Sequence, residues 1–270
     1  MVSVSRSAGV DLLDASATRA AIAAARPLVV YHLAARAHVG DSWRDPAGTL
    51  RDNVAMTLNV LEAVRGEVPE ATVVAVASGE VYGPPDRLPV DEAAPLQPQN
   101  PYAVSKASGD LLAGFYADAH GLRVIRARAF NHAGPGQAPV YAIASFAKQF
   151  AAALEARESP VRLVTGNPDT RRDYTDVRDV VRAYRLLAER AEPGVYNVCS
   201  GRTASSAELV RMLGQQPVGA HDVAHVGVVA PRVRVAGDDA RGALRRLARE
   251  RGDRVPVSYT HLTLPTNREV

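Results

Sequence analysis

The residue pair best suited to proton transfer is Tyr102 and Lys106, which lie four positions apart. If a helix begins at Pro101, both side chains share one helical face. An ammonium beside a phenol favours the phenolate and lowers the pKa of the tyrosine, which makes it a usable acid or base near neutral pH. Lysine is rare here, because only Lys106 and Lys148 are lysines among 32 basic residues. The alternative is an ordinary helix whose lysine is solvated.

Ser78 is the second candidate for chemistry, because it ends an apolar run that begins at Ala71. In parallel α/β sheets the carboxyl ends of the strands face the ligand crevice. A hydroxyl there could hydrogen-bond a carbonyl or carbinol oxygen while Tyr102 moves the proton. The alternative is a serine that simply ends a strand before a turn, so Ser78 gains weight only together with Tyr102 and Lys106.

Alternating strand and helix patterns must position these residues. Short apolar runs predict buried strands at 27–35, 71–78, 122–130 and 196–200. Helical patterns lie between and after them, at 16–26 with Asp14 or Ser16 as cap, at 50–64, at 103–119, and after a capping box from Ser205 to Glu208. This alternation predicts an α/β fold with a doubly wound parallel sheet. Pro and Gly cluster at 83–101 and 134–139, which predicts loops at the ligand-binding edge. His32 ends a strand and is predicted to be structural.

Several segments together resemble one enzyme family. They are His32–Ala35, Ser78–Gly83, Pro101–Lys106, Phe130–Gln137 and Arg171–Asp179. The set is similar to the extended branch of the short-chain dehydrogenase/reductases, also called the NAD-dependent epimerase/dehydratase family, and within it to the enzymes that act on GDP-linked sugars. The resemblance runs from about Gly9 to about Leu213 and is diffuse from 214 to 254.

The resemblance implies a Rossmann-like fold with a small C-terminal substrate lobe, and NAD or NADP as cofactor. It implies that Ser78, Tyr102 and Lys106 are catalytic. It also implies a set of cofactor-binding residues, which comprises Asp11 and Leu12 at the adenine, Leu33, Ala34, Ala35 and Arg36 at the pyrophosphate and ribose, Asn53 on the helix behind the cofactor, Tyr102 and Lys106 at the nicotinamide ribose, and Phe130 at the nicotinamide.

For the substrate, the resemblance implies a nucleotide sugar, best matched by a GDP-linked one. Ser78 and Glu80 would contact the sugar, while Asn131 and Arg172 would hold the diphosphate. An arginine fork suits phosphate well. The alternative for Arg172 is a surface charge paired with a neighbouring aspartate. The family also implies a homodimer formed through the helices near 50–65 and 103–119.

The family's phosphate-binding turn, G-x-x-G-x-x-G after a first strand, has no match in this sequence. That turn supplies backbone amides and a helix N-terminus to the pyrophosphate. We expect the first strand, its turn and the residue that selects NAD or NADP to be missing, a loss of roughly 40–60 residues by this fold's usual layout. We therefore expect the gene to encode an enzyme and this polypeptide to be weakly active or inactive.

We predict a truncated dinucleotide-binding domain at 1–130, rejoined by about 174–199, and a mainly substrate-binding lobe at 131–256. Residues 257–270 lack alanine, have three threonines and resemble the translation of a sequencing-library adapter, so they are predicted to be non-native.

Four functions remain open. The first is reduction of GDP-4-keto-6-deoxy-D-mannose at C4, which is favoured. Dehydration of GDP-mannose follows, with Glu80 removing the C5 proton, although dehydratases of this family usually have threonine at the place of Ser78. A 4-epimerase comes third, and a non-catalytic nucleotide-binding scaffold is the alternative from another class.

Composition excludes several other classes. The net charge is only +3, without a long basic run, so no nucleic-acid partner is expected. The single cysteine, Cys199, excludes an internal disulfide and fits a reducing compartment. No apolar stretch reaches membrane-spanning length, no signal-peptide core is present and no metal-ligand spacing occurs, which together predict a cytoplasmic protein without a metal.

Overall fold

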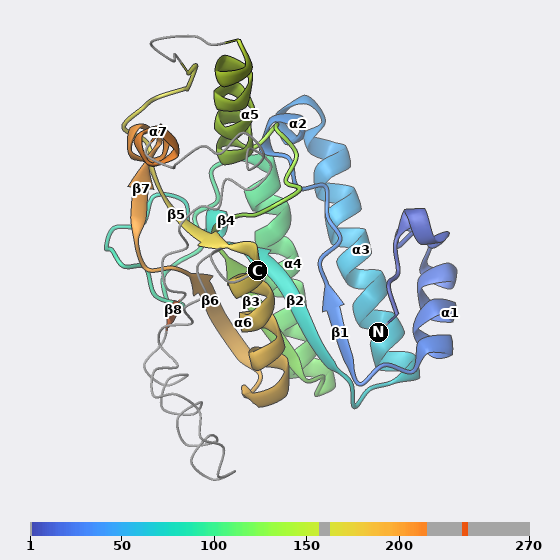
Figure 1. The fold of residues 1–270 in the computed structure, drawn as a ribbon. Helices are drawn as coiled ribbons and strands as arrows, with labels where there is room; N and C mark the ends of the chain where they lie inside the picture. The colour runs from blue at the N-terminus through green and yellow to red at the C-terminus, as the bar shows by residue number, and fades with distance from the viewer. Residues whose placement is uncertain (1, 157–162, 215–233, 237–270) are drawn as a thin grey trace, which may run out of the picture. The chain divides into compact units, whose positions relative to one another are not determined.

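The computed structural model describes residues 2–156, 163–214 and 234–236 (Figure 1). Its internal contacts divide the chain into two units. Among the described residues, the first unit holds 2–129, 183–198 and Ala236, and the second holds 130–182, 199–214 and 234–235. The predicted adapter-like tail at 257–270 and most of the diffuse region from 214 to 254 lie outside the described residues.

A parallel sheet forms the centre of the first unit. Its strands are β1 (Val29–His32), β2 (Thr72–Ser78), β3 (Val124–Ala129) and β6 (Gly194–Cys199), in the order β1-β2-β3-β6 with the short β8 (Arg234–Ala236) after β6. The pairs β1–β2, β2–β3 and β3–β6 are all parallel. All four predicted strands are confirmed, with ends that differ by at most three residues. Ser78 pairs in register with Ala129, so the carboxyl ends of β2 and β3 meet.

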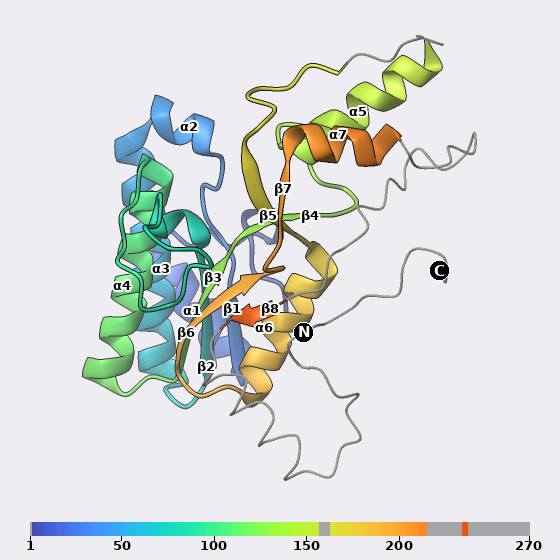
Figure 2. The ribbon, with the colours of Figure 1, turned by 90° about the vertical axis from the view of Figure 1, so that its left-hand side faces the viewer.

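Helices cover both faces of this sheet, which explains why its middle strands are apolar throughout. In β2, the adjacent residues Val73 and Val74 are both fully buried, although their side chains point to opposite faces. The helices α3 (Pro46–Glu67) and α4 (Pro101–His120) lie side by side on one face, and the half of α6 (Val177–Arg190) from Ala183 lies on the other (Figure 2). The chain therefore has the predicted doubly wound, Rossmann-like α/β fold.

The helix ends follow their capping residues. The helix α1 (Ala15–Ala25) packs on α3 and is capped by Asp14, not Ser16. Asp45 caps α3 ahead of Pro46, so this helix begins four residues before the predicted start. Asn100 caps α4, and a proline again occupies the first position. Gly121 ends α4 at a φ of +67°, in the left-handed region that favours glycine.

The second unit contains a small mixed sheet and two helices. Its strands are β4 (Asn131–Ala133), β5 (Arg171–Asp176) and β7 (Thr203–Ser205), where β4 is parallel and β7 antiparallel to β5. The helices α5 (Ala142–Glu155) and α7 (Ser206–Gly214) pack with this sheet around Phe146 and Leu209. The capping box is confirmed, because Ser205 N donates to Glu208 Oε2 at 2.8 Å and Glu208 N donates to Ser205 Oγ at 3.1 Å.

Three short elements complete the first unit. They are two 3-10 turns, η1 (Arg6–Ala8) and η2 (Gly79–Tyr82), and the helix α2 (Val39–Arg44). Among the described residues, no helix is both long and apolar enough to cross a membrane. Within the same part of the chain, no three His, Cys, Asp or Glu side chains cluster as a metal site would require.

Candidate active site

Lys106 lies in the second turn of α4 and points its amine at the sheet. Its Nζ donates a hydrogen bond of 2.5 Å to the carbonyl of Val76 in β2. Burial lowers the pKa of Lys106 to about 8, and the nearby charge of Asp110 opposes that shift. The ammonium is therefore held at the end of β2, two residues before Ser78.

Ser78 is the last residue of β2 and is buried. Its hydroxyl Oγ accepts a hydrogen bond of 3.2 Å from the amide of Glu80 and so caps the η2 turn. The Glu80 carboxylate in turn accepts a hydrogen bond of 3.4 Å from the side-chain amide of Asn100, the capping residue of α4. The turn that follows Ser78 is thus tied to the start of the helix that carries Tyr102.

Tyr102 is the second residue of α4 and is half-buried. Its carbonyl accepts a hydrogen bond of 2.7 Å from the hydroxyl of Ser105. Tyr184 of α6 lies close enough for the Tyr102 phenol to add to the rise of the Tyr184 pKa, which burial mainly causes. Because α4 packs against both β2 and η2, the fold places Ser78, Glu80, Tyr102 and Lys106 on three neighbouring elements.

A small hollow lies at this end of the sheet. It contains four of the residues predicted to bind the cofactor, which are Ala34, Ala35, Asn53 and Lys106. His32 and Asp110 also line it. His32 is buried, with Nε2 3.1 Å from Thr57 Oγ1, and burial with the Lys106 charge lowers its pKa to about 4. A neutral, hydrogen-bonded imidazole agrees with the structural role predicted for His32.

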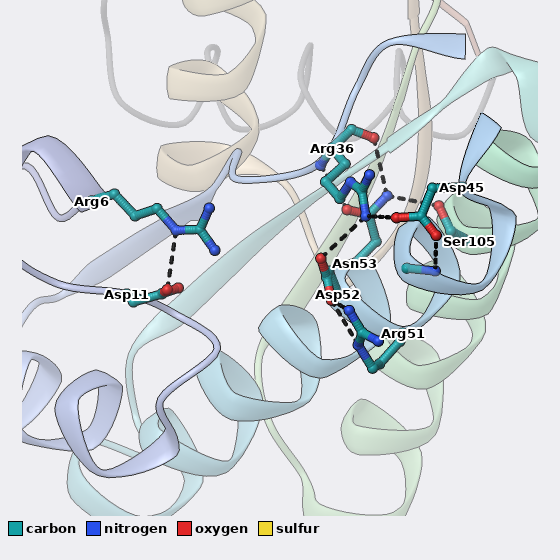
Figure 3. A network of polar contacts seen from close by, with 9 residues as sticks. Arg6, Asp11, Arg36, Asp45, Arg51, Asp52, Asn53 and Ser105 are labelled. Atoms are coloured by element: carbon teal, nitrogen blue, oxygen red, sulfur yellow. Dashed lines mark hydrogen bonds and ion pairs between the residues drawn. The ribbon is translucent and has the colours of Figure 1, made fainter. Parts of the chain in front are cut away.

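Asn53 joins the chain that follows β1 to helix α4 (Figure 3). Its Oδ1 accepts a hydrogen bond of 2.7 Å from the amide of Arg36, and its Nδ2 donates to the Arg36 carbonyl at 3.2 Å. The same Nδ2 donates to Ser105 Oγ at 2.8 Å. Asn53 therefore fixes the main chain beside Ala34 and Ala35, and it does so from the helix on which the sequence placed it.

The Arg36 side chain is engaged with carboxylates of α3 and its cap (Figure 3). Its Nη1 lies 2.7 Å from Asp45 Oδ2 and 3.4 Å from Asp52 Oδ2. The hydrogen bond and charge of Asp45 are the main cause of a raised Arg36 pKa, and Arg36 lowers the pKa of Asp45 in return. In this structure the guanidinium holds the loop in place, whereas Leu33 is exposed.

Asp11 and Leu12 lie before α1, away from the hollow. The Asp11 carboxylate accepts hydrogen bonds from the amide of Leu13 at 3.0 Å and from Arg6 Nε at 3.1 Å (Figure 3). These two contacts, the amide first, lower the pKa of Asp11. Leu12 packs against the core, and its carbonyl accepts a hydrogen bond of 2.8 Å from Asn59 Nδ2.

The remaining predicted residues, Phe130, Asn131 and Arg172, belong to the second unit. Asn131 is in β4 and pairs in register with Tyr174. Arg172 is exposed in β5, where it pairs in register with Ala204 of β7, and its Nη1 donates to the carbonyl of Arg171 at 3.0 Å.

The neighbouring aspartates, which were the alternative partners of Arg172, have other contacts. The Asp173 carboxylate accepts hydrogen bonds from the amides of Ser200 at 2.8 Å and Gly201 at 2.7 Å. The Asp176 carboxylate pairs with Arg178 at 2.9 Å. Arg172 thus keeps an exposed guanidinium on β5.

A buried polar group surrounds Arg128 and was not predicted from the sequence; it contains Tyr82, Asp110 and Asn197. Its signal was present, because the apolar run at 122–130 carries Arg126 and Arg128 inside a strand that should be buried. A buried arginine requires an acidic partner, and Asp110, one helical turn beyond Lys106, could have been proposed as that partner.

Comparison with known proteins places the chain in a family. The model of the GDP-mannose 4,6-dehydratase family matches residues 5–230. The chain belongs to this family. It is 42% identical over 190 residues to a GDP-6-deoxy-D-mannose reductase of Pseudomonas aeruginosa, an alignment that covers 69% of this chain and 62% of that protein. It is 28% identical over 197 residues to a GDP-mannose 4,6-dehydratase of Sinorhizobium fredii, over 72% of this chain and 56% of that protein.

Among solved structures, RMD from Pseudomonas aeruginosa complexed with NADPH superimposes with a TM-score of 0.71 at 40% identity, over 76% of this chain and 70% of that one. The family chain therefore shares fold and sequence with both reductases and dehydratases. It spans about three-fifths of the length of the curated relatives that it matches, 62% and 56% in the two cases given.

Proposed function

We propose that this chain carries the catalytic part of an NAD(P)-dependent enzyme that reduces GDP-4-keto-6-deoxy-D-mannose at C4. The main support is that Ser78, Tyr102 and Lys106 lie at the end of β2 and the start of α4, in a chain 42% identical to a GDP-6-deoxy-D-mannose reductase. A nicotinamide cofactor, when bound, supplies the hydride for such a reduction.

The residues around the hollow fit the ribose end of such a cofactor. Ala34 and Ala35 line it with side chains of a single carbon, so little separates their main chain from a ligand. Lys106 uses one of its three N–H donors on the Val76 carbonyl, which leaves two for ribose hydroxyls. The solved relative from Pseudomonas aeruginosa holds NADPH. We propose NAD or NADP for this chain and leave the preference open.

In the proposed reaction, Ser78 Oγ donates a hydrogen bond to the oxygen on C4 and orients it. Tyr102 gives its phenolic proton to that oxygen as it becomes a hydroxyl. The ammonium of Lys106 stabilises the phenolate that remains. Asn131 and Arg172 of the second unit are proposed to hold the diphosphate, for which the exposed Arg172 fork is suited.

Dehydration of GDP-mannose is the second candidate, and a specific observation supports it. Glu80 stands two residues after Ser78, and Asn100 Nδ2 holds its carboxylate at 3.4 Å, next to the cap of the Tyr102 helix. A carboxylate at that position could remove the C5 proton once C4 is oxidised. Reduction needs no such base.

Two substrates separate these functions. We would incubate the chain, and a fusion that adds a strand followed by the G-x-x-G-x-x-G turn, with GDP-4-keto-6-deoxy-D-mannose plus NADPH and separately with GDP-mannose. Loss of NADPH absorbance with the keto-sugar supports reduction. A keto-sugar product from GDP-mannose alone supports dehydration. Neither product from a folded fusion would leave a 4-epimerase or a non-catalytic scaffold.

Two variants sharpen the test. Tyr102→Phe removes the proton donor and should lower turnover by about 10²–10⁴-fold, the usual contribution of a positioned acid. Tyr31→Phe, on the exposed side of β1, is the matched control and should leave turnover unchanged. Glu80→Gln should abolish dehydration and spare reduction, so its effect identifies which of the two reactions the site performs.

A further inference from the structure

A buried polar network fills the space between β3 and α4 in the first unit. Arg128 projects from β3 with 5% of its side chain exposed, and Asp110 projects from α4 with none exposed. Arg128 Nη2 lies 2.7 Å from Asp110 Oδ2, and Nε lies 3.4 Å from Oδ1, so the guanidinium forks onto the carboxylate. Asp110 stands one helical turn beyond Lys106, and both line the same hollow.

The other end of the guanidinium reaches a different segment. Arg128 Nη1 donates to the hydroxyl of Tyr82 at 2.9 Å and to the carbonyl of Glu92 at 3.1 Å. The Tyr82 hydroxyl donates to Asn197 Oδ1 at 2.7 Å. Asn197 also bonds this segment directly. Its side-chain Nδ2 donates to the carbonyl of Val90 at 3.2 Å, and its backbone N donates to Glu92 Oε1 at 2.9 Å.

These contacts anchor residues 83–100, which connect the Glu80 turn to the Tyr102 helix. The segment has no helix or strand of its own. Its ends are closed by a hydrogen bond of 2.9 Å from Gln97 N to the carbonyl of Val81. Gly83 adopts a φ of +61°, and a Cβ there would lie 2.1 Å from the Gln97 carbonyl oxygen. The side chains of the network hold the middle of this segment, which has no strand pairing to hold it.

We propose that Asp110 and Arg128 are positioning residues for the catalytic set, an inference that rests on the function proposed above. Through Tyr82 and Asn197 they fix the 83–100 segment, and through the Asp110 carboxylate they fix the Lys106 turn of α4. A buried ion pair adds little stability compared with apolar packing of the same volume. A complete set of hydrogen bonds around it instead specifies one arrangement of the two elements.

The charges that face Lys106 come from three elements. His32 approaches from β1 and is neutral above a pKa of about 4. Asp110 approaches from α4 itself and favours the ammonium. Behind Asp110 stand two cations of β3, with Arg126 Nη1 3.6 Å and Arg128 Nη2 2.7 Å from its carboxylate. Removing the Asp110 charge would leave these cations uncompensated, so Lys106 should lose its proton at lower pH.

The chain offers a direct measurement, because it has only two lysines. Protein labelled with ¹³Cε-lysine gives two side-chain signals in NMR spectra, and Lys148→Arg assigns them by removing one. We expect the Lys106 signal of the unchanged protein to titrate near pH 8 and that of Asp110→Asn to titrate at lower pH. Asp118→Asn removes an exposed charge from the same helix and should leave the titration where it was. Equal titrations in Asp110→Asn and the unchanged protein would refute the role of Asp110.

A second variant tests the link to the 83–100 segment. Tyr82→Phe keeps the ring and removes the hydroxyl that joins Arg128 to Asn197. We expect amides of 83–100 to exchange hydrogen about tenfold faster, since a lost buried hydrogen bond costs roughly that factor in opening. Tyr196→Phe is the control. Tyr196 stands next to Asn197 in β6, and its hydroxyl donates to the carbonyl of Glu192 at 2.8 Å, outside the network.

Exchange that is unchanged in 83–100, or that rises equally in α1 and β1, would mean that the network only stabilises the fold and would overturn the positioning role. Neither readout uses a cofactor or a sugar. Failure of the turnover assays would therefore count against the proposed reaction alone, while wild-type behaviour of both variants would count against the positioning role alone.

Discussion

Asn53 and Ser105, which are 52 positions apart in sequence, share a hydrogen bond of 2.8 Å from the asparagine Nδ2 to the serine Oγ. Asn53 also holds both the amide and the carbonyl of Arg36, and Ser105 donates onward to the carbonyl of Tyr102. One buried amide thus sets the distance between the loop that follows β1 and the first turn of α4. That distance determines whether one ligand can contact both the loop after β1 and the helix.

We predict that Asn53→Ala lowers the free energy of unfolding by roughly 2–3 kcal/mol, because it removes three hydrogen bonds of about 1 kcal/mol each from a buried position. Urea denaturation followed by circular dichroism measures this loss. Ser105→Ala removes one of the three together with the bond from Ser105 Oγ to the Tyr102 carbonyl, and should cost about 2 kcal/mol. A loss of only about 1 kcal/mol in Asn53→Ala would show that the Arg36 main chain gains nothing from Asn53.

Stability should fall as the pH drops below neutrality, and His32 should be one cause. Its folded-state pKa of about 4 lies below the ordinary 6.5, so the folded protein binds fewer protons than the unfolded chain between these values. We expect a loss of about 2 kcal/mol from this residue between pH 7 and pH 4.5. Urea denaturation of His32→Gln at several pH values should show a fall over that range that is shallower by that amount.

Asp179 should act in the opposite direction. Its side chain is fully buried, its Oδ2 has no hydrogen-bond partner within the described residues, and burial raises its pKa to about 6. The folded protein then binds more protons than the unfolded chain between pH 3.8 and 6, so the cost is complete above pH 6.

Asp179→Asn should therefore raise the free energy of unfolding by about 2 kcal/mol at pH 7 and leave it nearly unchanged at pH 4. Asp176→Asn is a matched comparison, because Asp176 pairs with Arg178 at 2.9 Å and its loss should destabilise the protein. A gain for Asp179→Asn that is the same at both pH values would point to packing and not to the buried charge.

Much of the fold could be predicted because local signals agreed with the tertiary structure. Apolar runs ended where β2 and β3 end, and capping residues such as Asn100 and Ser205 stand at true helix starts. The helix α6 was not predicted, although its signal was present, because buried apolar residues such as Val180, Tyr184 and Leu187 repeat at helical spacing. The strands β4 and β7 have three residues each, too few for a period to show.

In the candidate site, too, some relationships could be predicted from the sequence and others could not. Tyr102 and Lys106 stand four positions apart on α4, so sequence spacing alone places them on one side of that helix. The contacts of Arg128 with Tyr82 and of Tyr82 with Asn197 join residues 46 and 115 positions apart, and no local pattern encodes them. Arg36 was expected at the cofactor, but its ion pairs with Asp45 and Asp52 depend on where α3 begins.

The last prediction concerns cofactor affinity. The hollow offers Lys106 and the main chain near Ala35, but the sequence has no G-x-x-G-x-x-G turn to give amides and a helix N-terminus to a pyrophosphate. We therefore expect the 270-residue chain to bind NADPH more weakly than micromolar, as measured by titration of NADPH fluorescence. The fusion that adds a strand and the G-x-x-G-x-x-G turn should bind at micromolar concentration, and Lys106→Met in that fusion should weaken binding again. Micromolar affinity of the chain alone would mean that its own backbone supplies the phosphate contacts.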